Sequence, residues 1–396
     1  MAQPIERKLK PKADAQPSSS FERKMMWLTT ISFFVILMVI GVGTILREDR
    51  VSSQLENRTL AQSVKPTVQG VISGDDMVKM ESYFTDQLVL RGTLVEMQAR
   101  LSKSVLRQPF RNGIYKAEDG YLIEPSQAAQ PIVPDAFQQF TQDVDRPVYF
   151  ALAPSKTVIA ERDGIIPDYV ASNAEQRYKT MQGGFTKAGM TSIPLDALKL
   201  TDYFKTDHHW NIDGAYQAYD EIIRTVEKTE PTLKKVAMDP QAKRSSEHPY
   251  FGSLARKTTL AYASAGDKME YYDANQFNGI DVCYDNKCGQ PLIDEQFIKE
   301  EGDYADRYEV FMRGNHGILS MTSKTKGPKL LVLKDSFANP VLPFLANSAN
   351  LEVVDIRYVN KDFDASEFAK QKNVDAVVFL HNANIAGLMK TYQQKL

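Results

Sequence analysis

An unbroken hydrophobic segment near the start of the chain contrasts with the mixed patterns that follow it. Met25 to Leu46 contains 22 residues without a single charge. As a helix it would measure about 33 Å, enough to cross a hydrocarbon core of about 30 Å. A buried helix of a soluble protein is rarely apolar on all faces. The pattern therefore favours a transmembrane helix over residues 25–46.

The charges around this segment predict its orientation. It is preceded by a cluster of basic residues: Arg7, Lys8, Lys10, Lys12, Arg23 and Lys24. The basic residues after it are offset by acidic ones, so the N-terminus is expected in the cytoplasm and the body outside it, with the chain crossing the cell membrane once. The segment begins late and lacks a small-x-small exit, which favours a retained anchor over a cleaved signal peptide. Residues 1–24 are too polar to form a core and are expected to be a disordered cytoplasmic tail.

The C-terminal third alternates between strand and helix patterns. Strands are predicted at 329–334, 351–356 and 374–380, with helices from about 338 and around 366–370. This βαβαβ succession predicts an α/β fold, a three-layer sandwich with a parallel, flavodoxin-like sheet. Residues 50–396 are long enough for one such domain. Residues 230–325 carry dense charge and few apolar runs, so they are expected to be an irregular insertion or lid.

Two more elements are visible upstream. Asp75 to Ser104 has helical spacing, either as one helix or as two broken near Arg91. Val148 to Ala153 is an apolar run of strand length, followed by Ser155 at its carboxyl end.

Composition excludes some functions. A formal net charge of −2 provides no basic surface for nucleic acid. The two cysteines, Cys283 and Cys288, lie close together in a polar stretch, and outside the cytoplasm they could form a disulfide. A metal site on these cysteines is disfavoured because no further cysteine exists and only five histidines are present.

Asp207-His208-His209-Trp210, followed by an amphipathic helical pattern, contains the first candidate for chemistry. A hydroxyl nucleophile needs a base within hydrogen-bond reach and a carboxylate that fixes the tautomer of that base. Acid and base stand together here. The structural alternative is that Asp207 or Asn211 caps the helix and the histidines pack beside it.

Ser336 is the candidate nucleophile. The apolar strand 329–334 ends in Asp335-Ser336, and a helical pattern follows, which would place Ser336 at the carboxyl edge of a sheet. Backbone N–H groups of the next helix could then stabilise an oxyanion. The pair could instead be an N-cap. Ser155 is a rival nucleophile, although no acid and base lie near it in sequence.

Together, the two segments resemble the SGNH-hydrolase-like proteins of the alginate O-acetyltransferase type (AlgJ and AlgX) and the DHHW family named after the tetrapeptide. The serine of that superfamily lies in a Gly-Asp-Ser block, and in the alginate branch a circular permutation places Asp-x-His before it. The resemblance implies that Ser336 is the nucleophile, His209 the general base and Asp207 its orienting carboxylate. Lys334 stands where the block usually has glycine. His208 is the other candidate base, and we assign it a structural or substrate-contacting role.

Shorter matches extend the resemblance, at residues 52–60, 86–91, 250–254 and 308–317. In the last of these blocks the resemblance implies that Gly314 and Asn315 donate to the oxyanion. A turn is the structural alternative for this pair. Arg313 could hold a carboxylate or a sugar hydroxyl.

The resemblance implies a membrane-anchored O-acetyltransferase or carbohydrate esterase that needs no cofactor or metal. Its expected substrate is an exopolysaccharide or cell-envelope polysaccharide, with acetyl groups supplied by a membrane-bound O-acyltransferase partner. One alternative is a noncatalytic polysaccharide-binding or scaffold protein. Another is a DHH phosphoesterase that binds Mn²⁺, but the further aspartate motifs of that family are missing.

Overall fold

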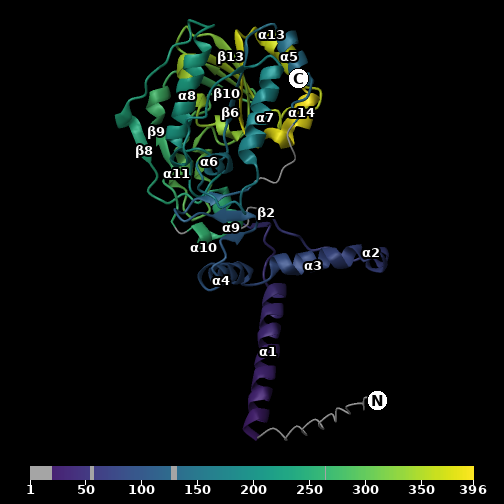
Figure 1. The fold of residues 1–396 in the computed structure, drawn as a ribbon. Helices are drawn as coiled ribbons and strands as arrows, with labels where there is room; N and C mark the ends of the chain where they lie inside the picture. The colour runs from purple at the N-terminus through teal and green to yellow at the C-terminus, as the bar shows by residue number, and fades with distance from the viewer. Residues whose placement is uncertain (1–19, 54–57, 126–131, 264) are drawn as a thin grey trace, which may run out of the picture. The chain divides into compact units, whose positions relative to one another are not determined.

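The computed structural model describes residues 20–53, 58–125, 132–263 and 265–396 (Figure 1). The chain divides into two compact units: Met1–Ser53 with Arg58–Leu94, and Gln54–Asn57 with Val95–Leu396. From the sequence, one domain was expected over residues 50–396, whereas the larger unit contains Val95–Leu396. The expected limits of that domain stay a prediction.

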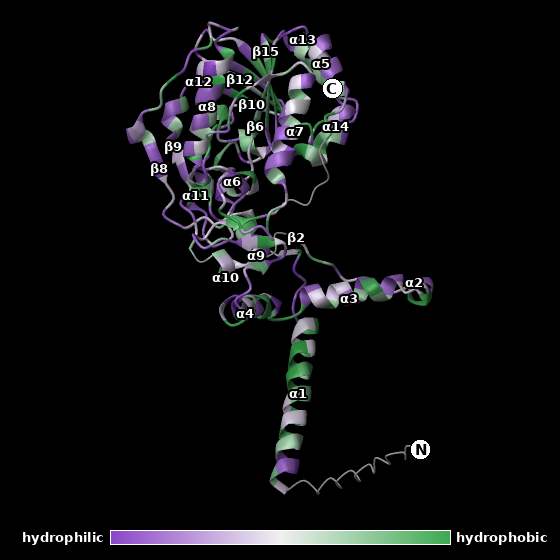
Figure 2. Cartoon of the chain, viewed as in Figure 1, coloured by the Kyte–Doolittle hydropathy of each residue, from purple (hydrophilic) through white to green (hydrophobic). Residues whose placement is uncertain are grey.

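The first unit contains the apolar helix α1, Ser20–Leu46. Figure 2 shows it largely in the colours of hydrophobic residues, and its length and composition would allow it to cross a membrane. Residues 20–24, assigned to the tail from the sequence, lie in this helix, while residues 1–19 lie outside the described part. The unit also contains β1 (Ser52–Ser53), β2 (Arg58–Thr59), α2 (Val68–Ser73) and α3 (Asp75–Gln87).

Asp86 links two of the short sequence blocks within this unit. Its carboxylate accepts hydrogen bonds from Arg58 Nη1, at 2.8 Å, and from the Ala61 N–H, at 2.9 Å. The Arg58 guanidinium, more than the Ala61 N–H, lowers the pKa of Asp86 to about 2 against the opposing effect of burial. The predicted break near Arg91 is confirmed, because α3 ends at Gln87 and α4 spans Arg91–Ser104.

An eight-stranded sheet forms the centre of the second unit, in the order β11-β10-β12-β14-β13-β15-β6-β7. The five strands from β14 to β7 pair in parallel, and β12, β10 and β11 extend one edge in antiparallel fashion. The strands are β6 (Val148–Ala153), β7 (Thr191–Ser192), β10 (Asp281–Tyr284), β11 (Lys287–Cys288), β12 (Ile318–Thr322), β13 (Lys329–Lys334), β14 (Asn350–Val354) and β15 (Ala376–Asn382).

Helices cover both faces of this sheet, as Figure 1 shows for α8 on one side and α7 on the other. Alternate residues of β6 separate the two cores: Tyr149 and Ala151 join one cluster, and Phe150 and Leu152 join the other. The helices are α5 (Ala136–Val144), α6 (Lys156–Arg162), α7 (Ala174–Lys187), α8 (Ile212–Val226), α12 (Leu342–Ser348), α13 (Ala365–Lys372) and α14 (Met389–Gln393). The predicted α/β fold with a mostly parallel sheet is confirmed, including the βαβαβ order of its C-terminal third.

Residues 230–325 contain more regular structure than their charge suggests. They supply β10, β11 and β12 to the central sheet, and β8 (Lys243–Ser245) pairs with β9 (Glu270–Tyr272). Cys283 and Cys288 face each other across the β10–β11 hairpin and form a disulfide. The segment also contains α9 (Ser253–Thr258), α10 (Leu260–Ala263) and α11 (Gln296–Lys299).

The remaining strands form a small antiparallel sheet: β3 (Phe110–Arg111), β4 (Ile114–Lys116) and β5 (Leu122–Ile123). Ile114 and Leu122 pack with Leu254 and Tyr262 in a third buried cluster. Short 3₁₀ segments complete the unit: η1 (Leu200–Asp202), η2 (Pro240–Ala242), η3 (Ala274–Phe277), η4 (Arg307–Val310), η5 (Ser336–Ala338) and η6 (Ile385–Leu388).

Candidate active site

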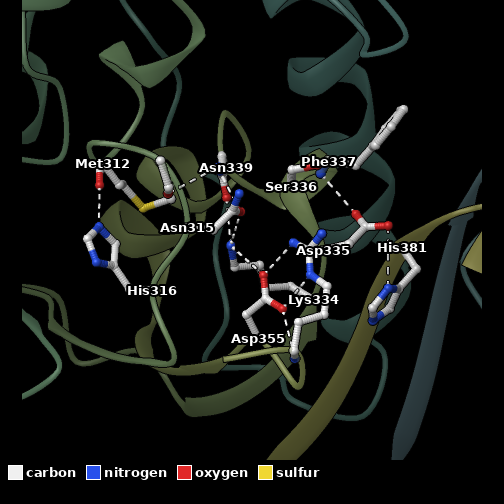
Figure 3. A network of polar contacts seen from close by, with 12 residues as sticks. Met312, Asn315, His316, Lys334, Asp335, Ser336, Phe337, Asn339, Asp355 and His381 are labelled. Carbon is white, nitrogen blue, oxygen red and sulfur yellow. Dashed lines mark hydrogen bonds and ion pairs between the residues drawn. The ribbon is translucent and has the colours of Figure 1, made fainter. Parts of the chain in front are cut away.

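Ser336 lies at the carboxyl end of β13, where the strand turns into η5. The turn is held by Asp335, whose Oδ1 accepts from the Phe337 N–H at 2.9 Å and whose Oδ2 accepts from the Asn382 N–H at 3.0 Å. His381 Nδ1 lies 3.5 Å from Asp335 Oδ2 (Figure 3). Burial disfavours the carboxylate, but His381 and the two N–H donors outweigh it and lower the pKa of Asp335. Asp335 is thus the helix-cap residue of the Asp-Ser pair, which leaves the Ser336 hydroxyl available.

His209 reaches Ser336 from the segment before α8. Its Nε2 lies 2.8 Å from Ser336 Oγ, and its Nδ1 lies 2.6 Å from Asp207 Oδ1. The helix cap is supplied by Asn211, whose side-chain oxygen accepts from the N–H groups of Asp213 and Gly214. Asp207 is therefore not the cap residue of α8.

The hydrogen bonds determine the tautomer of His209. An ionised carboxylate can only accept, so Nδ1 carries the proton and Nε2 of the neutral ring accepts from the Ser336 hydroxyl. Burial opposes ionisation of Asp207, but the two neighbouring histidines outweigh it and hold its pKa well below the usual range. The arrangement can remove the serine proton and stabilise the imidazolium that results.

The block 250–254 holds the acid in place. The Ser253 N–H donates to Asp207 Oδ2 at 2.6 Å, and the Gly252 N–H donates to Thr206 Oγ1 at 3.1 Å. Glycine is required at 252 because a Cβ there would lie 2.2 Å from Asp207 Cβ. From the sequence, the block 250–254 was recognised as a match to the family, but no role in the site was predicted for it.

His208 lies beside His209 but makes different contacts. Its Nδ1 is 2.7 Å from Ser253 Oγ, and its side chain is 45% exposed against 8% for His209. Only His209 bridges Asp207 and Ser336. His208 contributes to the wall of the cavity described below.

Tyr308 supports both His209 and Ser336. Its ring stacks on the imidazole of His209, with centroids 4.0 Å apart and planes 13° apart. Its hydroxyl donates to the carbonyl oxygen of Ser336 at 3.0 Å. Tyr308 lies in the block 308–317 but was not predicted to belong to the site, since a stacking contact leaves no signal in the spacing of residues.

A polar cavity of about 510 Å³ opens over these side chains. It is lined by all the residues predicted for the site together with several that were not: Asp207, His208, His209, Tyr250, Ser253, Arg256, Asp306, Tyr308, Glu309, Arg313, Gly314, Asn315, Ser336, Asn339, Arg357 and Tyr358.

Gly314 and Asn315 differ as candidate oxyanion donors. Gly314 has a φ of 92°, and its N–H donates to the Phe311 carbonyl at 3.2 Å, as the turn interpretation predicts. Asn315 uses its side-chain oxygen to accept from Lys334 Nζ at 2.9 Å, which turns its NH₂ group away from the lysine. Asn315 is therefore the better candidate of the two.

Lys334 is the centre of a buried network beneath the turn (Figure 3). It is fully buried, and its Nζ donates to Asn339 Oδ1 at 2.8 Å as well as to Asn315. Asp355 Oδ2 lies 3.4 Å from the same nitrogen and is also bound by Arg357. Burial lowers the pKa of Lys334 to about 8, although the charge of Asp355 opposes this. Lys334 thus orients two amides of the cavity wall.

Ser155 occupies a different environment. Its hydroxyl caps α6 by accepting from the Val158 N–H at 3.3 Å. Within the described residues no histidine or carboxylate hydrogen-bonds to it. The neighbouring Lys156 donates to the carbonyls of Phe204 and Lys205.

Asp207, His208 and His209 place their ligand atoms within 4.8 Å of one another, a spacing that could hold a metal ion. Both ring nitrogens of His209 are already hydrogen-bonded to side chains, however. A metal at His209 would have to displace Ser336 or Asp207, so the observed contacts suit proton transfer better.

Comparisons with known proteins show what the chain is similar to. Residues 125–278 match the sequence model of the SGNH hydrolase-like domain of the acetyltransferase AlgX. This part of the chain is therefore similar to an SGNH hydrolase-like domain of the acetyltransferase type. The matched range contains Asp207 and His209 but ends before Ser336. The resemblance drawn from the sequence is confirmed.

Two solved structures share the fold. A DHHW family protein from Eubacterium siraeum is 18% identical, with a TM-score of 0.56 over 72% of this chain and 97% of its own. PatB1 of Bacillus cereus, solved with a sulfonyl adduct, is 21% identical, with a TM-score of 0.57 over 72% of this chain and 98% of its own. A comparison with curated proteins gave no match.

Proposed function

We propose that the chain is a serine acyltransferase that O-acetylates a polysaccharide outside the cytoplasm. The observation that carries the proposal is the hydrogen-bonded series Asp207–His209–Ser336, with distances of 2.6 Å and 2.8 Å. The match of residues 125–278 to an acetyltransferase domain supports acetyl as the transferred group.

The proposed reaction has two halves. His209 Nε2 takes the proton of Ser336 as Oγ attacks the acetyl ester, and Asp207 stabilises the imidazolium. The developing oxyanion is stabilised by the NH₂ group of Asn315. The imidazolium then protonates the leaving alcohol, which leaves an acetyl-serine. In the second half His209 removes the proton of a sugar hydroxyl, whose oxygen attacks the acetyl group. The imidazolium then returns that proton to Ser336 Oγ as the bond between the acetyl carbon and the serine oxygen breaks.

The N-terminal helix and the cavity support the setting of this reaction. Helix α1 is apolar over its length and would serve as an anchor, with the preceding basic residues in the cytoplasm. The acetyl group would be delivered by a membrane-bound O-acyltransferase. The polar walls of the cavity suit a hydroxyl-rich polymer better than an apolar ester.

The proposal is tested with the full-length protein in detergent and p-nitrophenyl acetate as the donor. The parent should release p-nitrophenol, and Ser336→Ala or His209→Ala should lower kcat/KM by at least about 10³-fold. Folding of each variant is checked by its melting temperature. Folded variants as active as the parent would exclude this mechanism and favour a noncatalytic polysaccharide-binding protein, whereas chelator-sensitive phosphodiester cleavage would favour a metal phosphoesterase.

A further inference from the structure

The three arginines that line the cavity differ in how they are paired. Arg313 Nε lies 2.5 Å from Asp294 Oδ2, and Arg357 donates to both oxygens of Asp355. Arg256 Nε, in contrast, is buried with no hydrogen-bond partner among the described residues. Its nearest ion-pair partner is distant, with Nη1 3.7 Å from Asp306 Oδ2.

Such an arginine needs further acceptors. Its side chain is only 7% exposed, and a guanidinium has five N–H donors that are costly to bury unpaired. Because Arg256 lines the cavity, a bound molecule can supply oxygen acceptors there. Arg256 lies in α9, the helix that begins with Ser253, whose N–H holds Asp207. The unpaired Nε therefore belongs to a residue within one helical turn of Ser253, which positions the acid.

The charges of the cavity indicate what that molecule is. Its three arginines are balanced by three acids, Asp207, Asp306 and Glu309. An anionic group that approached Arg256 would meet Asp306, whose side chain is 47% exposed. A pair of adjacent hydroxyls fits both groups, since one oxygen can accept from arginine while the other hydroxyl donates to the carboxylate.

We propose that Arg256 and Asp306 form a subsite for an uncharged sugar and bind two adjacent hydroxyl groups of the acceptor. This deepens the proposed function, on which it rests for the nature of the acceptor. The subsite selects neutral sugars over uronic acids, because a carboxylate at the same position would be repelled by Asp306.

Binding is measured in full-length Ser336→Ala, so that no reaction occurs. Failure of the catalytic proposal is detected separately, by ester hydrolysis with the parent protein. The probes are neutral gluco-, galacto- and manno-oligosaccharides, each paired with its uronic acid counterpart. At least one neutral probe should bind more tightly than its counterpart. Adding Arg256→Gln or Asp306→Asn should weaken that binding by about tenfold or more, as expected for the loss of a hydrogen bond to a charged group.

Lys257→Gln is the matched control. It lies in the same helix, and its half-exposed side chain pairs with Glu124 instead of lining the cavity. It should bind the probe as Ser336→Ala does. Because the side chain of Asp306 is half exposed, Asp306→Asn is expected to fold. It therefore tests the subsite even if substitution of the buried Arg256 disturbs folding. The proposal is overturned if both variants keep unchanged affinity or if no neutral probe binds. It is also overturned if uronic acids bind more tightly and Arg256→Gln abolishes that binding.

Discussion

The ring of Tyr308 stacks on the imidazole of His209, with centroids 4.0 Å apart and planes 13° apart. The same residue donates a hydrogen bond to the Ser336 carbonyl at 3.0 Å. One side chain therefore fixes both the proposed base and the backbone of the proposed nucleophile.

The two contacts of Tyr308 can be separated by substitution. Tyr308→Phe keeps the stack and loses one hydrogen bond, so kcat for p-nitrophenyl acetate should fall by less than about tenfold. Tyr308→Ala also frees the imidazole and should lower kcat by about 10²-fold, since misplacement of a catalytic group is that costly. Equal losses in the two variants would show that the stack does not position His209.

Gly252 is predicted to be intolerant of even one added methyl group. A Cβ at this position would lie 2.2 Å from Asp207 Cβ and 2.4 Å from its Oδ2. Gly252→Ala should displace the carboxylate and lower kcat/KM by about 10²-fold, measured by ester hydrolysis.

Gly183→Ala is the control for this substitution. It lies in α7, and a Cβ there would have nothing within 4 Å. It should keep full activity and stabilise the fold by about 0.5–1 kcal/mol. A Gly252→Ala enzyme with the activity of the control would contradict the tight approach to Asp207.

Much of the fold was predictable because it follows from hydrophobic periodicity. The strand Val148–Ala153 and the strand Lys329–Lys334 are found with the predicted bounds. The family resemblance led to the expectation that Asp207, His209 and Ser336 lie together, and the structure brings them into hydrogen-bonding contact. The edge strands within 230–325 could not be predicted, because their short alternating runs are interrupted by charged turns. They join the sheet only by tertiary pairing, in which β10 pairs with β12 and β12 pairs with β14.

The supporting residues of the site escaped prediction for a different reason. Ser253, Tyr308 and Asn339 act through contacts with residues far away in the chain. Arg256 is recognisable only by its burial and its unpaired Nε. None of these properties is encoded by local spacing.

Lys334 should influence both catalysis and the pH dependence of stability. Lys334→Met removes the donor that holds Asn315 Oδ1, so kcat should fall by about tenfold or more through loss of an oriented oxyanion donor. In an Asn315→Ala background the same substitution should have little further effect on kcat. Additive losses in the double variant would separate Lys334 from Asn315.

The pH effect follows from the pKa of about 8 in the folded state against an ordinary 10.5. Between these values the unfolded chain holds a proton that the folded protein has released, so stability rises with pH. The parent should gain up to roughly 3 kcal/mol relative to Lys334→Met between pH 7 and 10.5. Urea unfolding of both proteins at several pH values measures this, and parallel profiles would contradict it.

The most direct test of the central claim is to trap the acyl-enzyme. Full-length protein is mixed with p-nitrophenyl acetate, quenched in acid and digested, and the acetylated residue is located by mass spectrometry. We expect an acetyl group on Ser336 that is absent in His209→Ala. Acetylation of Ser155 instead, or equal labelling of Ser336 without His209, would contradict it.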